Sequence, residues 1–443
     1  MNPTAAEVHY ISKDIIYPAT YSDSTQRLEL TPWDLGLLAV NAIQKGLLFN
    51  SKPTHSTWLT DLKTSLSTAL DHFYLLAGRL AIETNEEDDT VSIFIKCNNH
   101  GAEFIHATAD ITVSDITTPV HVPRIVHEFF PLNDSINYDG SGAQPLLSVQ
   151  ITELIDGVFI GFTMNHMIAD GSSYWHFINS WSEICASRSS QIQRAPILKR
   201  WFLNKTDSPV HIPPSTIQNS IRSYSLPPLQ ERILHFAPHN IAKLKQKAFL
   251  EINNKTMRLS SLQAVLAHVW VGVTKARNLD SEQIVHYRML MGNRARLSPP
   301  LADEYFGNSM ISGYATVKAG ELLNGGIGFA ASLLNEAVSL HTNEKICTAW
   351  ENFMKGPRFI MFDDLVSNVL ITGSSPRFNM YGNDFGWGRP IAVRSGCGNK
   401  YDGKMTVYPG AVPGSMEIEA CLSPETMKVL GDDNDFFEFI GAT

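Results

Sequence analysis

Hydrophobic and polar positions in the first 200 residues alternate between the two periods that are typical of helices and strands. In residues 58–74 the apolar positions recur every three to four residues, which predicts an amphipathic helix. Residues 146–154 and 158–164 are rich in β-favouring side chains and flank an Asp-Gly pair, so we predict a β-hairpin there. The second of these runs is apolar at nearly every position, as in a strand buried on both faces. A further amphipathic helix is predicted over residues 174–184.

The second half of the chain repeats this alternation after a segment of different composition. Residues 201–228 are rich in Pro, Ser, Asn and Thr and are predicted to form a linker stiffened by proline. Beyond it, the pattern predicts helices over 262–273 and 328–341, a strand before Gly292, short strands over 366–421 and a closing helix after Ser423. We therefore predict an α/β fold with two domains of similar size, residues 1–200 and 229–443, each a mixed β-sheet with flanking helices. The cleft between two such domains is the usual place for a ligand site.

The composition indicates an ordinary soluble globular protein. Of 443 residues, 44% are apolar and 18% charged, and 35 basic against 44 acidic side chains give a formal charge of −9. This balance argues against a nucleic-acid-binding protein, whose affinity depends on neutralising phosphates. No apolar run approaches the roughly 18 residues of a membrane span, and residues 1–10 lack the pattern of a secretory signal. The five cysteines lie far apart without a CxxC pair, which favours reduced thiols in a cytoplasmic protein.

The first candidate functional residues are His166 and Asp170. They lie in the segment His-Met-Ile-Ala-Asp-Gly (166–171), directly after the predicted buried strand. A histidine has an ordinary pKa of about 6.5, so it can take and return a proton at neutral pH. An Asp four residues later can orient the ring or brace the loop. Other interpretations stay open here: a structural histidine, a metal site with His176, or a Ser-His-Asp hydrolase. The metal site lacks a third nearby ligand, and the sequence has no GxSxG motif.

Two further segments carry residues that suit a functional site. Residues 384–388, Asp-Phe-Gly-Trp-Gly, predict a tight loop with a packed tryptophan, and no phosphate-binding motif accompanies the two glycines. Arg294 and Arg296 can each form a bidentate pair with a carboxylate such as Asp170. Two exposed surface arginines are an equally good interpretation of these residues.

Four segments, taken in their order along the chain, resemble motifs of the plant BAHD acyltransferases. They are Leu-Ala-Gly-Arg-Leu (76–80), the 166–171 segment, Tyr-Phe-Gly-Asn (305–308) and the 384–388 segment. An HxxxD motif followed far downstream by DFGWG is a specific combination. Residues 373–378 and 399–404 resemble one branch of the family, with cuticle-related members and uncharacterised acetyltransferases. Many other members have Trp at the position of Ser375, so their acceptor contacts are not transferred here.

The resemblance implies a chloramphenicol acetyltransferase-like arrangement. A channel would run between the two domains, entered by acyl-CoA from one side and by the acceptor from the other. His166 would be the general base in the middle of this channel. Asp170 would point away from the channel and pair with Arg294, which gives it a structural role.

The resemblance also implies roles for residues outside this motif. Asp384, Gly386, Trp387 and Gly388 would support the channel wall near the CoA entrance. Ser260 and Ser261 fall where family members line the pantetheine arm of CoA. Apart from the resemblance, Arg377 or Arg394 is a candidate to receive a carboxylate, with Arg377 as the candidate for binding the acceptor. Surface or backbone-bracing roles are equally good interpretations of both arginines.

The function that this resemblance implies is transfer of an acyl group from acyl-CoA to a hydroxyl or amine of a small molecule in specialised metabolism. A thioester is already activated, so one base and the alignment of two substrates suffice without a covalent enzyme intermediate. We expect acyl-CoA as co-substrate, no bound cofactor or metal, no nucleic-acid partner, and a monomer. The alternatives are a CoA-independent elimination or lyase reaction at the same site, and a catalytically silent small-molecule binder. Acetyl, malonyl, hydroxycinnamoyl, benzoyl and long-chain acyl donors all fit the sequence.

Overall fold

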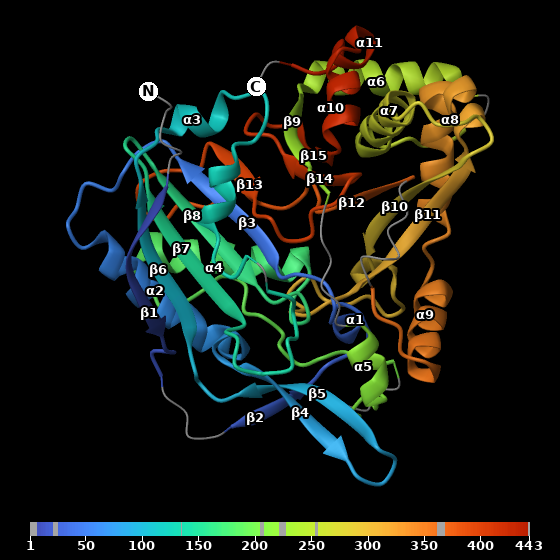
Figure 1. Ribbon diagram of the computed structural model, residues 1–443. Coiled ribbons are helices and arrows are strands. Elements are labelled where there is room, and N and C mark those ends of the chain that lie inside the picture. The colour runs from blue at the N-terminus through green and yellow to red at the C-terminus, as the bar shows by residue number, and fades with distance from the viewer. Residues whose placement is uncertain are drawn as a thin grey trace.

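Two six-stranded sheets form the framework of the protein in a computed structural model that describes residues 7–20, 25–133, 135–203, 208–220, 227–252, 256–360 and 368–441 (Figure 1). The first sheet contains, in spatial order, β1 (Val8–Ile16), β6 (Ala102–Ala109), β7 (Leu147–Glu153), β8 (Val158–Met164), β3 (Ile43–Phe49) and β13 (Ala392–Ser395). The second contains β11 (Met310–Lys318), β10 (Ile284–Gly292), β12 (Val369–Gly373), β14 (Lys404–Pro409), β15 (Met416–Leu422) and β9 (Gln230–Phe236). A third, smaller sheet consists of β2 (Gln26–Glu29), β5 (Thr90–Cys97) and β4 (Arg79–Asn85). The predicted α/β class with two sheet-based domains is confirmed.

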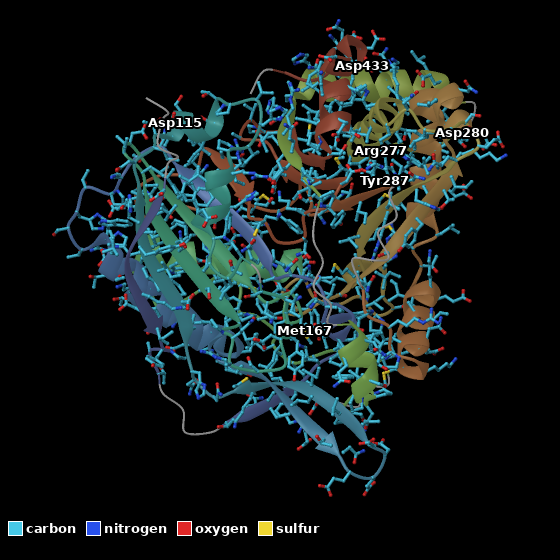
Figure 2. The ribbon with its side chains drawn as sticks, viewed as in Figure 1. Asp115, Met167, Arg277, Asp280, Tyr287 and Asp433 are labelled. Carbon is cyan, nitrogen blue, oxygen red and sulfur yellow. The ribbon has the colours of Figure 1, made fainter. Side chains whose placement is uncertain are left out.

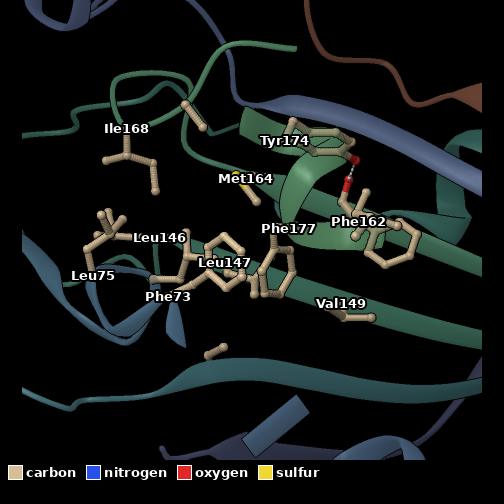
Figure 3. Packing of buried hydrophobic residues seen from close by; sticks show 14 of the residues in the cluster. Phe73, Leu75, Leu146, Leu147, Val149, Phe162, Met164, Ile168, Tyr174 and Phe177 are labelled. Atoms are coloured by element: carbon tan, nitrogen blue, oxygen red, sulfur yellow. Dashed lines mark hydrogen bonds between the residues drawn. The ribbon is translucent and has the colours of Figure 1, made fainter. Parts of the chain in front are cut away.

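The first sheet buries one face beneath α2 (Trp58–His72) and α4 (Gly171–Ser187). The predicted hairpin is present as β7 and β8, and every residue of β8 is buried. Figure 3 shows Phe73, Val149 and Phe177 among the residues of the apolar cluster between these elements. Tyr174 of α4 fixes the helix to the sheet, because its hydroxyl donates to the Phe162 carbonyl at 3.0 Å. The strand that leads to the candidate histidine is therefore held rigidly from both sides.

The second sheet is covered on one face by α6 (Pro238–Glu251), α7 (Ser261–Ala276), α8 (Ala319–Ser339) and α10 (Pro424–Gly431), which lie away from the first sheet (Figure 1). Helix α8 begins ahead of the predicted range 328–341. It contains a kink at Gly326, whose φ of +70° is not helical. Because the kink interrupts the helical period, the apolar pattern predicts only the part of the helix that follows it. The shorter helices are α1 (Pro32–Leu35), α3 (Val113–Thr117), α5 (Pro214–Ser220), α9 (Asn343–Lys355) and α11 (Asn434–Phe437).

One strand of the second half lies in the first sheet. β13 pairs antiparallel with β3, with Ala392 opposite Leu48 and Ser395 opposite Lys45. The predicted domain 229–443 thus contributes a strand to its neighbour. A strand of four residues has no sequence signal that says which sheet it joins.

The predicted linker and strand series differ from the structure in detail. Within 201–228 the structure has helix α5, while residues 204–207 and 221–226 lie outside the described part. The predicted strands over 366–421 begin with β12 at Val369, and residues 366–367 also lie outside it. All five cysteines are free. No helix in the described ranges is long and apolar enough to cross a bilayer.

Candidate active site

His166 is the one partly exposed residue in an otherwise buried stretch from Gly157 to Asp170. Strand β8 ends at Met164, and the chain turns through residues 166–168 before α4 begins. In Figure 2 the neighbouring Met167 lies near the middle of the molecule. His166 is therefore a partly exposed residue on a rigid, buried support.

Asparagine side chains hold the backbone of the turn on both sides of His166. The His166 N–H donates to Asn137 Oδ1 at 2.7 Å, and Asn308 Nδ2 donates to the His166 carbonyl at 2.7 Å. Asn165 closes the turn, because its Nδ2 donates to the Asn137 carbonyl at 2.6 Å and its Oδ1 accepts the Met167 N–H at 2.9 Å. These hydrogen bonds fix the backbone from which the His166 ring extends, and the buried Nδ1 of that ring has no hydrogen-bond partner among the described residues.

The electrostatic environment lowers the pKa of His166. Burial is the largest cause, because it disfavours the charged imidazolium, and the positive charge of Lys404 acts in the same direction. The carboxylate of Asp170 opposes this effect without reversing it. At neutral pH the ring is therefore mostly neutral, which is the form that can accept a proton.

Asp170 pairs with Arg294 of the second half of the chain, the contact that the family resemblance implies. Arg294 donates from Nη1 to Asp170 Oδ2 at 2.5 Å and from Nη2 to Oδ1 at 3.0 Å. The Ser173 N–H donates to Oδ1 at 3.0 Å, which makes Asp170 the N-cap of α4, and the Ser309 N–H donates to Oδ2 at 3.0 Å. Burial by itself would raise the pKa of Asp170, but Arg294 and these hydrogen bonds hold it below its usual range. Asp170 is a buried, ionised, fully engaged carboxylate.

Arg294 also ties the segment 305–308 to the start of α4. Its Nη2 donates to the carbonyl groups of Tyr305 and Gly307, each at 3.1 Å, and to Ser173 Oγ at 3.1 Å. The Gly307 N–H donates to the same Ser173 Oγ at 2.9 Å. The Asp170–Arg294 pair is thereby part of a junction between the two halves of the molecule.

A second buried carboxylate, Asp34, supports the same junction. Its Oδ1 accepts from the N–H (3.1 Å) and Nδ2 (2.9 Å) of Asn308, and its Oδ2 lies 3.6 Å from Arg200 Nε. Arg200 Nη2 in turn donates to the Ile168 carbonyl at 3.0 Å. Asp34 lies in α1, whose N-cap is Thr31, and no local sequence pattern predicts its contact with Asn308.

The 384–388 loop is built on Asp384 and packs against the first domain. Asp384 Oδ1 accepts the N–H groups of Gly386 (2.8 Å) and Gly388 (3.0 Å), whose φ angles are +104° and +118°. Phe385 packs edge-on against Trp181 of α4 with centroids 5.1 Å apart, and Trp387 lies 6.0 Å from Trp58 at the start of α2. These contacts give the loop a structural role, while its predicted place near a CoA entrance stays a prediction.

The remaining predicted residues are not gathered around His166 by any contact in the described part of the chain. Ser260 is exposed and caps α7, since its Oγ accepts the Gln263 N–H at 3.2 Å, and Ser261 is the first residue of that helix. Arg377 is exposed, whereas Arg394 is buried on β13 and donates from Nη1 to a backbone carbonyl, that of Val393, at 2.9 Å.

Four surface hollows of about 320 to 460 Å³ are each lined by residues other than His166, so none of them is the predicted channel. One of these hollows lies between Tyr17, Arg79 and His100. In the part of the chain that the structure describes, no group of three His, Cys, Asp or Glu side chains is placed to hold a metal ion.

Comparison with known proteins finds relatives that match this chain over nearly its whole length. A family model described as the Transferase family matches residues 6–437. An uncharacterized acetyltransferase of Arabidopsis thaliana is 39% identical over 98% of this chain and 100% of its own length. The BAHD acyltransferase DCR of Arabidopsis thaliana is 32% identical over 97% of this chain and 92% of its own.

The fold is also that of a solved structure with much lower sequence identity. F. graminearum TRI101, crystallised with coenzyme A and T-2 mycotoxin, is 17% identical, with a TM-score of 0.74 over 94% of this chain and 99% of that one. The family assignment rests on sequence as well as on fold, because the family model and the relatives above 30% identity match nearly the whole chain. The chain belongs to the BAHD acyltransferases of the Transferase family.

Proposed function

We propose that this protein transfers an acyl group from acyl-CoA to a hydroxyl or amine of a small molecule, with His166 as the general base. The observation that carries the proposal is a single neutral, partly exposed imidazole on a buried and fully hydrogen-bonded turn. Family membership supplies the acyl-transfer chemistry, and the F. graminearum neighbour binds coenzyme A on the same fold.

In the proposed reaction both substrates are bound together and no covalent enzyme intermediate forms. The His166 ring takes the proton of the acceptor as its oxygen or nitrogen attacks the thioester carbonyl. The tetrahedral intermediate then collapses, the carbon–sulfur bond breaks, and the imidazolium returns the proton to the CoA thiolate. General base catalysis contributes about 10²–10⁴ to the rate, and alignment of the two substrates contributes the rest.

The buried pairs around the turn act on this reaction indirectly. Asp170 with Arg294, and Asp34 with Asn308, fix the turn that carries His166 and join it to the second half of the chain. They are positioning residues rather than catalytic ones. We expect acyl-CoA to bind as a co-substrate of a cytoplasmic monomer without a resident cofactor, with Ser260, Ser261 and the 384–388 loop on its side of the site.

A panel assay tests this proposal. Acetyl-, malonyl-, benzoyl-, hydroxycinnamoyl- and long-chain acyl-CoA are each incubated with mixed alcohols and amines, and free CoA thiol is measured. We expect acceptor-dependent CoA release with at least one donor, and mass spectrometry should find the ester or amide. A parallel incubation without CoA thioesters should give no product; a product formed from one small molecule alone would instead support lyase chemistry.

A further inference from the structure

The second sheet has one apolar face and one polar face. Residues such as Tyr287 and Met405 point toward α6, α7 and α8, so their neighbours along each strand point the opposite way. That opposite face meets the first domain, because Tyr408 belongs to the buried cluster of the first domain. Glu419 on the same face accepts the N–H of Ser395 in β13 at 3.2 Å. The polar face therefore lies between the two domains.

Two basic side chains occupy neighbouring positions on this face. Arg288 of β10 is opposite Ile371 of β12, and Ile371 is opposite Lys404 of β14, in parallel register. Residues opposite one another on adjacent strands project from the same face of a sheet. Arg288 is buried, and its Nε donates to Ser312 Oγ at 2.8 Å. Lys404 and Arg288 thus flank one apolar residue with two positive charges.

Lys404 differs from the nearby Lys400 in having no ion-pair partner among the described residues. The Nζ of buried Lys400 lies 2.5 Å from Glu231 Oε2 and also contacts Glu419. No carboxylate of the described residues forms an ion pair with Lys404, whose Nζ lies 5.5 Å from the centre of the Tyr401 ring. Burial of an ammonium group without a counter-charge is energetically unfavourable. An anionic partner would reduce this free-energy cost.

The segment that follows β12 connects the surroundings of Lys404 to the start of α4. A Cβ on Gly373 would be 3.0 Å from Lys404 Nζ, so this glycine leaves the space that the ammonium occupies. The chain continues from Gly373 to Phe378, whose ring lies against the start of α4, 2.8 Å from where a Cβ on Gly171 would be. The positive charge of Lys404 contributes to the lowered pKa of His166. The pKa of Lys404 itself falls to about 8, which leaves it mostly protonated at neutral pH.

We propose that this site takes a substrate that bears a carboxylate, which Lys404 binds with the help of Arg288 while the reacting group lies at His166. The inference rests on the proposed acyl transfer and adds the substrate class to it. The carboxylate can belong to the acceptor or to the acyl group, since both substrates would be bound at His166 during the reaction. A carboxylate accepts hydrogen bonds from an ammonium group and a guanidinium at once, and a neutral ester accepts them far more weakly.

The test compares carboxylate-bearing substrates with uncharged analogues that keep the reacting group. The analogue is the methyl ester for each acceptor and a thioester without the carboxylate for the donor. The acceptor pairs are 3-hydroxybenzoate, shikimate and L-phenylalanine with their methyl esters, and the donor pair is malonyl-CoA with propionyl-CoA. The enzymes are the wild type, Lys404→Met, Lys404→Arg and a control, Lys245→Met, which removes an exposed lysine of α6. We expect a preference of about 10-fold or more in kcat/KM for the charged member of at least one pair, as for a hydrogen bond to a charged group.

Lys404→Met should bring the ratio of kcat/KM for the charged and uncharged members close to one, Lys404→Arg should keep part of the preference, and Lys245→Met should keep all of it. If the preference appears in an acceptor pair, the carboxylate belongs to the acceptor; if it appears in the donor pair, the carboxylate belongs to the acyl group. No preference in any pair, or a preference that survives in Lys404→Met, overturns the inference. An equal rise in KM for every acyl-CoA in Lys404→Met also overturns it, since Lys404 would then bind the CoA phosphates.

If no thioester is consumed at all, the proposed acyl transfer fails, and a binding measurement decides on the carboxylate site independently. Calorimetry of the wild type with 3-hydroxybenzoate and with 3-hydroxybenzamide should show tighter binding of the acid, lost in Lys404→Met. Equal binding of the two compounds would contradict the inference. Thermal unfolding of each variant checks that it is folded.

Discussion

At the scale of single residues, the account depends on the protonation state of one imidazole. Burial and the charge of Lys404 lower the pKa of His166, so its neutral form persists to lower pH than that of an exposed histidine. The acid limb of the profile of kcat/KM against pH should therefore have its midpoint below pH 6.5, the ordinary value for histidine. Lys404→Met should move this midpoint upward, because it removes a positive charge that opposes protonation. A wild-type midpoint above 6.5 would contradict the assignment.

Asp170 provides a second test at this scale. Asp170→Asn keeps the shape but leaves the Arg294 guanidinium buried beside a neutral group. Breaking a buried ion pair costs about 3–5 kcal/mol, so urea denaturation should show a loss of that order in the free energy of unfolding. Activity should fall with it, because the pair fixes the start of α4. A variant with wild-type stability and activity would show that the pair does not support the site.

At the scale of elements, the 384–388 loop depends on two glycines in conformations that other residues rarely adopt. A Cβ on Gly388 would meet no atom within 4 Å, so Gly388→Ala tests only its φ of +118°. We expect a loss of about 1–3 kcal/mol in the free energy of unfolding. The matched control is Gly356→Ala at the end of α9, where a Cβ is equally free of contacts and φ is −165°. Equal effects of the two substitutions would show that backbone strain is not the reason for glycine at 388.

The elements that the sequence predicts well are those with a strong local period. The hairpin of β7 and β8 was predicted from two β-rich runs around an Asp-Gly pair, and the helix after Asp170 from its apolar period. The kinked start of α8 was missed, because Gly326 breaks the helical period. The place of β13 in the first sheet was missed because strand pairing depends on the whole fold rather than on four residues.

At the scale of the whole molecule, the site joins segments that are far apart in sequence. The motifs and the family resemblance led to His166 and Asp170 as candidate site residues and to a pairing of Asp170 with Arg294, and this contact is present. The support by Asp34, Asn137 and Asn308 could not be predicted, because it consists of side chains that reach the turn from distant segments. The positive interdomain face around Lys404 likewise appears only when three strands align.

The most direct test of the central claim uses one donor and one acceptor found in the panel, with the wild type, His166→Ala and His166→Gln. The measurement is kcat for CoA release, together with the Kd for CoA from calorimetry on the same preparations. We predict that kcat falls by about 10²–10⁴ in both variants, as expected for loss of a general base, while the Kd for CoA stays within a few-fold of the wild-type value. Wild-type turnover in a folded His166→Ala protein would contradict the account.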